Sequence, residues 1–387
     1  MIATFALFGV FWGAWGASLP QIEHAARAGS GTLGLALLLV GVGALGTMRL
    51  TGHLSDRLGP MVVPGTLVTL AFTWMLPPLA RSSAVLAATL LLVGASSGAY
   101  DVTINTAAAD TEAATRRPIL SLAHASYSGA VVATSLAVGV AIDGGATPQQ
   151  VFAVSGAITA VFVVVLVTDR HVQRTAAGPR AAATPATEAP GAGSPARVGR
   201  PLLILGGICG LSYFVEGAWQ NWGAIHIERT FGGSPALGAA GPAIFAMAAV
   251  VGRLSSHGLS HRFSTATALR TAGAMAACGT VVAAAAPSAG VALGGISIAG
   301  LGTSICAPLV FSLTGQVADP GRRGAATSTV NTIAYLGFVL GPAFVGVVAA
   351  SIGLRRALAL MALAALALAV LSRNTPVPPA EPRQSEY

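Results

Sequence analysis

Twelve apolar segments constrain this 387-residue chain more than any other feature of its sequence. A helix needs about 20 apolar residues to cross a bilayer, and each segment is long enough. They lie at residues 2–21, 31–54, 60–80, 83–108, 118–142, 149–168, 201–224, 234–256, 264–285, 288–315, 325–350 and 353–372. We therefore expect an all-α integral membrane protein with twelve transmembrane helices.

The scarcity of charge supports a bilayer as the solvent. Only 9% of the residues are charged, against roughly 25% in soluble domains. The formal net charge of +8 would favour nucleic acid as a partner of a soluble protein, but here the arginines are scattered between apolar segments. The three cysteines lie within those segments without metal-ligand spacing. We expect no nucleic-acid partner, no metal and no cofactor.

The polar stretches divide the chain into four parts. Residues 1–168 form one six-helix half, and residues 201–372 form the other. Residues 169–200, rich in Ala, Pro, Gly and Arg, are predicted to be a cytoplasmic linker, and residues 373–387 a cytoplasmic tail. With both termini inside, 16 of the 21 arginines face the cytoplasm and 5 the outside. This bias predicts a multi-pass inner (cell) membrane protein of bacterial type with cytoplasmic termini.

The two halves resemble each other at an offset of about 205 residues. Three matched pairs are Gly13-Ala14-Trp15 with Gly217-Ala218-Trp219, Ile22-Glu23 with Ile227-Glu228, and Arg49-Leu50 with Arg253-Leu254. Six spans repeated in the same orientation predict parallel halves related by an axis along the membrane normal, with a cavity between them.

The segment Gly-His-Leu-Ser-Asp-Arg-Leu-Gly at 52–59 resembles the loop signature of the major facilitator superfamily, Gly-x-x-x-Asp-Arg-x-Gly. Pro60 and Met61 stand where that family usually has a basic pair. The resemblance covers nearly the whole chain and implies the superfamily's twelve-helix fold. It also implies that the following residues and their repeat counterparts gate the conformational change: Gly52, Asp56, Arg57, Gly59, Arg253, His261 and Arg262.

A finer resemblance is to the branch around the fucose permease and its uncharacterised bacterial relatives. Three motifs carry it: Asp101-x-x-x-Asn105, His124-x-x-x-Ser128 and Glu216-Gly217-Ala218-x-x-x-Trp222. The chain departs from that branch at Asn221, where relatives often have Asp, and at Ser18, where they often have a basic residue.

Two acids and one histidine, Asp101, Glu216 and His124, lie well inside predicted spans, where ionisable groups usually face a cavity or a partner. Asp101 and His124 lie at matching depths, and we expect them to form a proton-titratable pair. The alternative is a hydrogen-bonded clamp between helices that never titrates. Glu216 lies near the midplane. We assign proton coupling to all three.

Aromatic and polar residues at similar depths are predicted to bind the solute, because rings stack on sugars and on flat molecules alike. The candidates are Trp12, Trp15, Asn105, Ser128, Trp219, Asn221, Trp222, Asn331 and Tyr335. The first, fourth, seventh and tenth spans carry no Arg, which favours a neutral or cationic solute over an anion.

These observations predict a monomeric secondary active transporter that works by alternating access and is driven by a proton gradient. Its partners would be the bilayer, protons and a small molecule, with sugar-like uptake and small-molecule efflux both open. One alternative is a non-transporting sensor, which would normally need a sizeable soluble domain. A membrane-embedded enzyme is a further alternative, but Asp101 and His124 lack a third catalytic group. We therefore expect no enzymatic activity.

Overall fold

The computed structural model describes residues 1–58, 62–117, 119–168, 199–319 and 322–376. Within them the chain is helical, and twelve helical segments are long and apolar enough to cross a membrane. The prediction of twelve transmembrane helices is confirmed. The α-helices are α1 (Ile2–Ala25), α2 (Ser30–Leu58), α3 (Val62–Trp74), α4 (Ser83–Thr115), α5 (Ile119–Asp143), α6 (Pro148–Thr168), α8 (Arg200–Phe231), α9 (Pro235–Arg262), α10 (Thr265–Ala285), α11 (Ala289–Val317), α12 (Arg323–Ile352) and α13 (Leu354–Leu371).

Local sequence explains where several helices begin and end. Ser82 and Ser288, one repeat apart, precede α4 and α11, and each side chain accepts a hydrogen bond from a backbone N–H of the first turn. Gly232 ends α8 in a left-handed conformation with φ of 64°. Helix α3 stops at Trp74, short of the predicted residue 80, and Pro77–Leu79 form a 3₁₀ turn instead. Pro77 and Pro78 lack the N–H that an α-helix needs.

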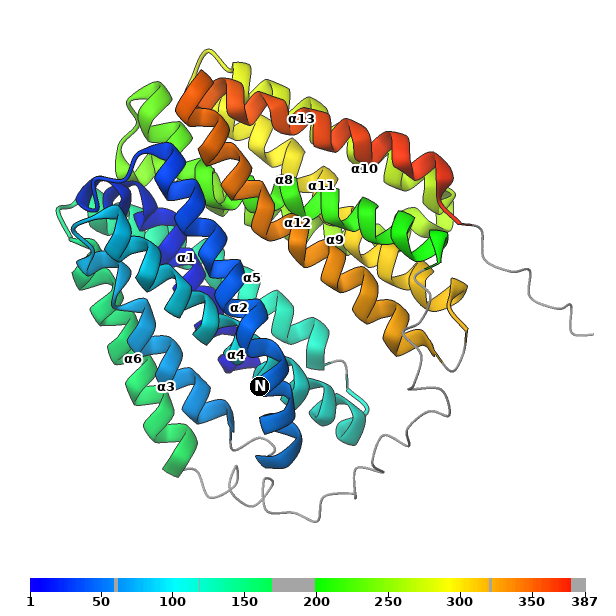
Figure 1. Cartoon of the computed structure of the whole chain (residues 1–387), viewed down its shortest axis with the longest axis horizontal. Helices are drawn as coiled ribbons and strands as arrows, with labels where there is room; N and C mark the ends of the chain where they lie inside the picture. Colours follow the sequence, from blue (N-terminus) through cyan, green and yellow to red (C-terminus); the bar gives the residue numbers. More distant parts are fainter. Residues whose placement is uncertain (59–61, 118, 169–198, 320–321, 377–387) are drawn as a thin grey trace, which may run out of the picture.

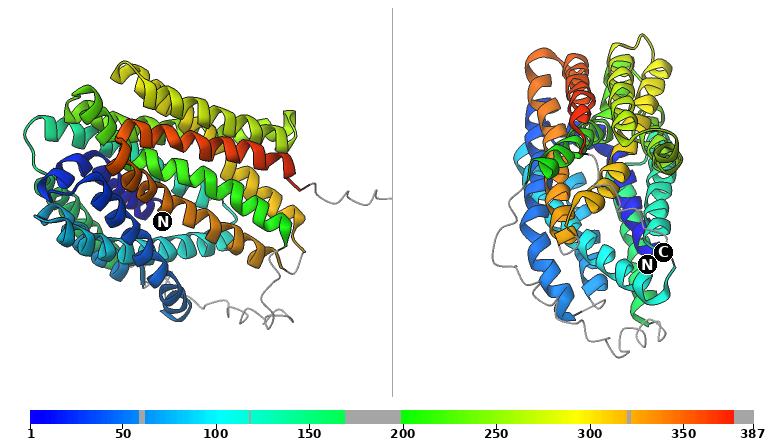
Figure 2. Two further views of the ribbon diagram at one scale, coloured as in Figure 1. Left: turned by 45° about the horizontal axis from the view of Figure 1, so that its top comes forward. Right: turned by 90° about the vertical axis from the view of Figure 1, so that its right-hand side faces the viewer.

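The helices form two groups, α1–α6 and α8–α13, which come together at one end and separate towards the other (Figure 1). The two further views show the same arrangement of long, roughly aligned helices (Figure 2). The predicted linker lies almost entirely outside the described residues, as does most of the predicted tail. The division of the chain at residues 168, 200 and 372 stays a prediction.

Two interfaces join the groups, α2 with α12 and α5 with α9. The sequence repeat relates α2 to α9 and α5 to α12, so these two interfaces are equivalent under it. Gly34 and Gly346 meet in one, and Gly139 meets Pro235 and Ala239 in the other. These residues lie near the α1–α2, α5–α6, α8–α9 and α12–α13 turns. We call this the closed end, and the end where α1 begins and α13 ends the open end.

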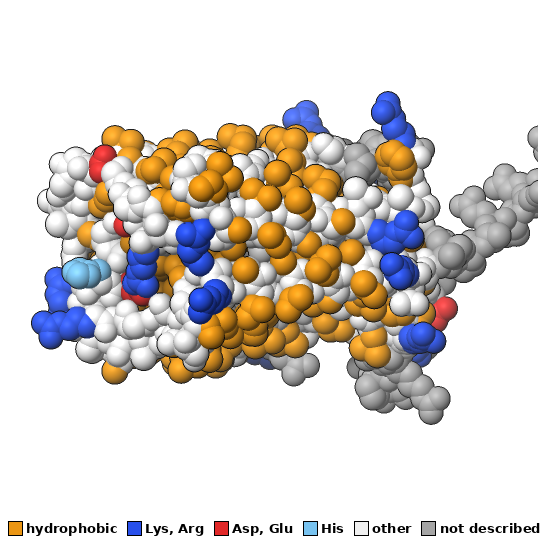
Figure 3. Space-filling model, turned by 90° about the horizontal axis from the view of Figure 1, so that it is seen from above, with side chains coloured by type: hydrophobic (Ala, Val, Ile, Leu, Met, Phe, Trp, Pro, Cys, Tyr) orange, Lys and Arg blue, Asp and Glu red, His pale blue; other side chains and the backbone are white. Residues whose placement is uncertain are grey.

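Apolar side chains cover the middle of the surface seen in Figure 3, and arginines lie nearer its two ends. Many large side chains elsewhere in the spans, including Val140, Val161 and Leu363, are also more than half exposed. Such a belt matches the hydrocarbon layer of a bilayer.

Candidate functional site

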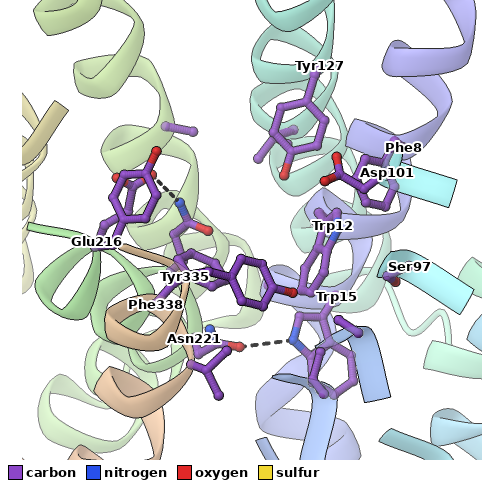
Figure 4. Close-up of a pocket in the computed structure, with 18 of the residues that line it drawn as sticks. Phe8, Trp12, Trp15, Ser97, Asp101, Tyr127, Glu216, Asn221, Tyr335 and Phe338 are labelled. Carbon is purple, nitrogen blue, oxygen red and sulfur yellow. Dashed lines mark hydrogen bonds between the residues drawn. The ribbon is translucent and has the colours of Figure 1, made fainter. Parts of the chain in front are cut away.

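A cavity lies between the two helix groups and is lined by α1, α2, α4, α5, α8, α9 and α12 (Figure 4). Its volume is about 310 Å³, which is within the range of small-molecule sites. Its lining includes eight of the predicted functional residues: Trp12, Trp15, Asp101, His124, Ser128, Glu216, Asn221 and Tyr335. It also includes Arg253, which we predicted to be a gating residue.

Asp101 is held by its own helix. The Asn105 side-chain amide donates to Asp101 Oδ1 at 3.0 Å and to the Asp101 backbone oxygen at 2.9 Å. Asn105 is not among the lining residues, and it positions the Asp101 carboxylate, which is. His124 packs edge-on against Phe5, with ring centroids 5.0 Å apart. Among the described residues no ion pair joins Asp101 to His124, so the expected pairing is wrong for this conformation.

The Glu216 carboxylate is bonded to two side chains, whereas that of Asp101 is bonded to one. Its Oε1 accepts hydrogen bonds from Gln220 Nε2 at 3.0 Å and from an Arg253 guanidinium nitrogen at 3.2 Å. Its Oε2 is buried without a hydrogen bond. An ion pair between α8 and α9 therefore lies inside the cavity. Arg253 lies on α9, so it brings a positive charge that was not expected from the absence of Arg in the first, fourth, seventh and tenth spans.

Asp101 and Glu216 share one local geometry. Each carboxylate is bonded to a carboxamide four residues later on the same helix, where side chains at i and i+4 lie one above the other. The two acids lie on opposite walls of the cavity, Asp101 with α4 and Glu216 with α8 (Figure 4).

The four tryptophans predicted to bind the solute fall into two pairs. Trp12 and Trp15 line the cavity. Trp219 and Trp222 are fully buried away from it, with their indole N–H groups donating to Thr280 Oγ1 at 3.2 Å and to the Pro342 backbone oxygen at 3.0 Å. Asn331 is exposed and lies outside the cavity lining. The substrate-binding role predicted for Trp219, Trp222 and Asn331 has no support in this geometry.

Several lining residues were missed, among them Phe8, Tyr127, Tyr213, Gln220 and Phe338. Helical spacing could have found three of them. Tyr127 follows His124 by three residues, and Tyr213 and Gln220 flank Glu216 at spacings of three and four.

A polar cluster ties α1 to α8 at the closed end. Arg229 forms an ion pair with Glu23 at 2.5 Å, and Gln21 Nε2 donates to Glu228 Oε2 at 3.2 Å. Glu23 has no exposed side-chain surface, whereas the Arg229 side chain is 46% exposed. Closer to the cavity, Trp15 Nε1 donates to Asn221 Oδ1 at 3.2 Å. The repeat had matched Glu23 with Glu228 but gave no reason for Glu23 to pair with Arg229.

The predicted gating loop lies at the open end. Asp56, Gly59 and His261 fall outside the part of the chain whose side chains are described. Arg57 and Arg262 are exposed there. Among the described atoms, a Cβ on Gly52 would meet nothing within 4 Å, so no close helix contact accounts for this glycine in this conformation.

Comparison with known proteins gives a consistent result. A family model described as the Major Facilitator Superfamily matches residues 1–335 and 271–386. An uncharacterised MFS-type transporter of Yersinia pestis is 26% identical over 382 residues, covering 96% of this chain and 93% of that protein. The uncharacterised transporter y4wD of Sinorhizobium fredii is 28% identical over 379 residues, covering 96% of each.

Solved structures show a similar fold at low sequence identity. A bacterial homologue of the human lysosomal transporter Spinster, in an inward-facing and occupied conformation, has a TM-score of 0.78 and 15% identity, over 97% of this chain and 95% of that one. The nucleoside transporter NupG has a TM-score of 0.77 and 13% identity, over 97% of each chain.

Proposed function

The chain belongs to the major facilitator superfamily, and from that premise we propose that it carries a small neutral or cationic solute across a bacterial inner membrane by alternating access, driven by protons. The superfamily consists of transporters, so the alternative of a membrane-embedded enzyme is excluded. The matched relatives are themselves uncharacterised. The finer resemblance to the fucose-permease branch stays a prediction.

One observation carries the proposal: the cavity between the helix groups holds Asp101, Glu216 and Arg253 at membrane depth. Charged groups are costly there and mark solute or proton pathways. The contacts between the groups lie towards the closed end, so a solute would enter this conformation from the open end. Two equivalent interfaces would allow the groups to rock about the cavity and expose it to the other side.

The arginine bias supports an open end that faces the cytoplasm, which would make this conformation inward-open. Asp101, His124 and Glu216 remain our candidates for proton coupling. His124 and Asp101 both line the cavity, although no direct bond joins them in this conformation. A small rotation of α4 against α5 would let them exchange a proton.

Flux into proteoliposomes tests the proposal. The purified protein is reconstituted, a pH gradient is imposed, and uptake of radiolabelled benzyltrimethylammonium, D-glucose and uridine is compared with uptake into protein-free vesicles. We expect at least one solute to cross faster with protein, and an uncoupler to abolish its accumulation. Asp101→Asn should remove the dependence on the pH gradient at saturating solute. Unchanged coupling would contradict the role of Asp101.

A protein that binds one of these solutes in detergent but moves none of them would contradict transport. That outcome would support the alternative of a sensor built on a transporter scaffold.

A further inference from the structure

We propose that the solute is an organic cation with a compact apolar body, bound between Asp101 and Glu216. This inference rests on the proposed function, because it names the class of solute that the same cavity would carry. It favours a cation over the sugar-like solutes that the sequence left open.

The first support is the state of the two carboxylates. Asn105 takes one oxygen of Asp101, and Gln220 and Arg253 share one oxygen of Glu216. Glu216 Oε2 is left without a hydrogen bond, although the Glu216 side chain is only 7% exposed. A buried carboxylate oxygen without a partner costs free energy, and a bound cation would offset that cost.

The second support concerns the amides and serine hydroxyls of the lining, most of which are already engaged. Asn221 accepts from Trp15 and donates to the Gly217 backbone oxygen, and the Gln220 amide donates to Glu216. Ser128 Oγ donates to the His124 backbone oxygen. Recognition of a polyol needs many donors and acceptors free for its hydroxyls. The lining groups left for a polyol include Ser97 Oγ, which is buried without a hydrogen bond, Trp12 Nε1 and the hydroxyls of Tyr127, Tyr213 and Tyr335. Most of these groups belong to aromatic side chains, which also favour a cation.

The third support is the aromatic wall. Trp12 and Tyr127 lie near Asp101 on one side. Tyr335 and Phe338 come from the opposite wall, and the Tyr335 ring reaches across towards Trp12 (Figure 4). Ring faces attract cations, with energies of about 2 kcal/mol when both partners are desolvated. Aromatic faces also bury the apolar body of a solute.

The charge balance points the same way. The described lining contains two acidic residues, Asp101 and Glu216, and one arginine, Arg253. When all three are ionised, their net charge is −1. One monovalent cation would neutralise that charge. Apart from the tyrosines, the other titratable side chain in the described lining is His124, which adds no negative charge. An anion would meet two carboxylates and an arginine that is already bonded to Glu216.

Binding by the full chain in detergent micelles tests this without requiring transport. The probes are benzyltrimethylammonium, its neutral isostere neopentylbenzene, D-glucose, and phenylacetate as an anion. Binding is measured as the increase in Tm and as a change in tryptophan fluorescence, to which Trp12 and Trp15 of the lining contribute. We expect benzyltrimethylammonium to bind about tenfold or more tightly than neopentylbenzene, and glucose and phenylacetate to leave Tm unchanged.

Isosteric variants locate the site. Asp101→Asn and Glu216→Gln should each weaken binding of the cation by about tenfold, whereas Asp110→Asn, an exposed acid on the same helix as Asp101, should not. Glu216→Asp keeps the charge and should bind more tightly than Glu216→Gln. The Tm of each variant without ligand shows whether it is folded.

The inference is overturned if glucose binds and the cation does not, if no probe binds at millimolar concentration, or if both Asp101→Asn and Glu216→Gln bind the cation like wild type. Its failure is distinct from that of transport. Glucose flux would refute the solute class alone, and tight cation binding without flux would refute transport alone.

Discussion

At the residue scale, the site depends on how each buried charge is compensated. A charge in a membrane interior persists where it is paired or hydrogen-bonded. Glu216 has Gln220 and Arg253, and Asp101 has Asn105. Each acid thus carries an amide partner from the next helical turn, which fixes its rotamer and leaves part of its carboxylate available to a ligand.

The pairing of Glu216 with Arg253 makes a prediction for stability. Arg253→Gln should lower Tm, because it withdraws a positive charge from a carboxylate that is 7% exposed. The double variant Glu216→Gln with Arg253→Gln should melt above the single Arg253→Gln, because it no longer buries an unpaired charge. The measurement is a double-mutant cycle by thermal unfolding in detergent.

The matched control replaces Arg270, an exposed arginine on α10. Arg270→Gln should show no coupling to Glu216→Gln. Additive effects of the Glu216 and Arg253 substitutions would contradict the pair.

At the element scale, small residues set how closely the helix groups approach. A Cβ on Gly34 of α2 would lie 2.8 Å from the Gly346 Cα and 2.9 Å from the Ala343 backbone oxygen. These distances are too short for a side chain, so the contact of α2 with α12 requires glycine at both positions. The polar cluster of α1 and α8 adds charge pairing to the same end of the molecule.

Gly34→Ala should therefore push α2 away from α12 and favour conformations in which the closed end opens. Spin labels on Thr32 and Ile352, both exposed, would report the separation in a background without the three native cysteines. We expect a longer mean distance than in wild type.

Gly46→Ala on the same helix is the control, because a Cβ there would meet none of the described atoms within 4 Å. It adds the same helix propensity, about 1 kcal/mol at most, without a clash. Equal distance distributions for the two variants would show that the glycine contact does not hold the closed end together.

The polar cluster of Gln21, Glu23, Glu228 and Arg229 makes a second prediction at this scale. Arg229→Gln should leave the buried Glu23 carboxylate without its counter-ion and destabilise the closed end by roughly 1–2 kcal/mol, since Arg229 is itself half exposed.

A cysteine placed at Ser18, which is buried beside the cluster on α1, would then react faster with a membrane-impermeant maleimide. Arg81→Gln, an exposed arginine in the turn before α4, is the control and should leave the rate unchanged. If the cysteine at position 18 reacts at the same rate with and without Arg229→Gln, the pairing of Arg229 with Glu23 has no role in closure.

At the scale of the whole molecule, the two interfaces and the polar cluster all lie at one end, so the cavity is accessible from the other. The repeat makes the interfaces of α2 with α12 and of α5 with α9 equivalent. A rocking motion about the cavity would then open both at once. The lipid-facing belt of apolar side chains need not change during such a motion (Figure 3).

Accessibility from the two sides of the membrane tests this arrangement. A cysteine at Ala246 in the cavity lining should react with an impermeant thiol reagent faster in inside-out vesicles than in right-side-out vesicles. Val164→Cys, on an exposed apolar face of α6, is the control and should react slowly in both. The reverse order would mean that the open end faces outward.

The sequence by itself determined the twelve spans, the repeat and the depth of Asp101 and Glu216. In a bilayer each helix must satisfy its own backbone hydrogen bonds, so a segment's length and hydropathy suffice to predict it. Only the tertiary structure decided which groups meet. Arg253 turned towards Glu216, Asn105 rather than His124 bonded Asp101, and Trp219 and Trp222 faced away from the cavity. Those contacts depend on how each helix is rotated against its neighbours, and twelve apolar helices carry too little periodicity to fix that rotation.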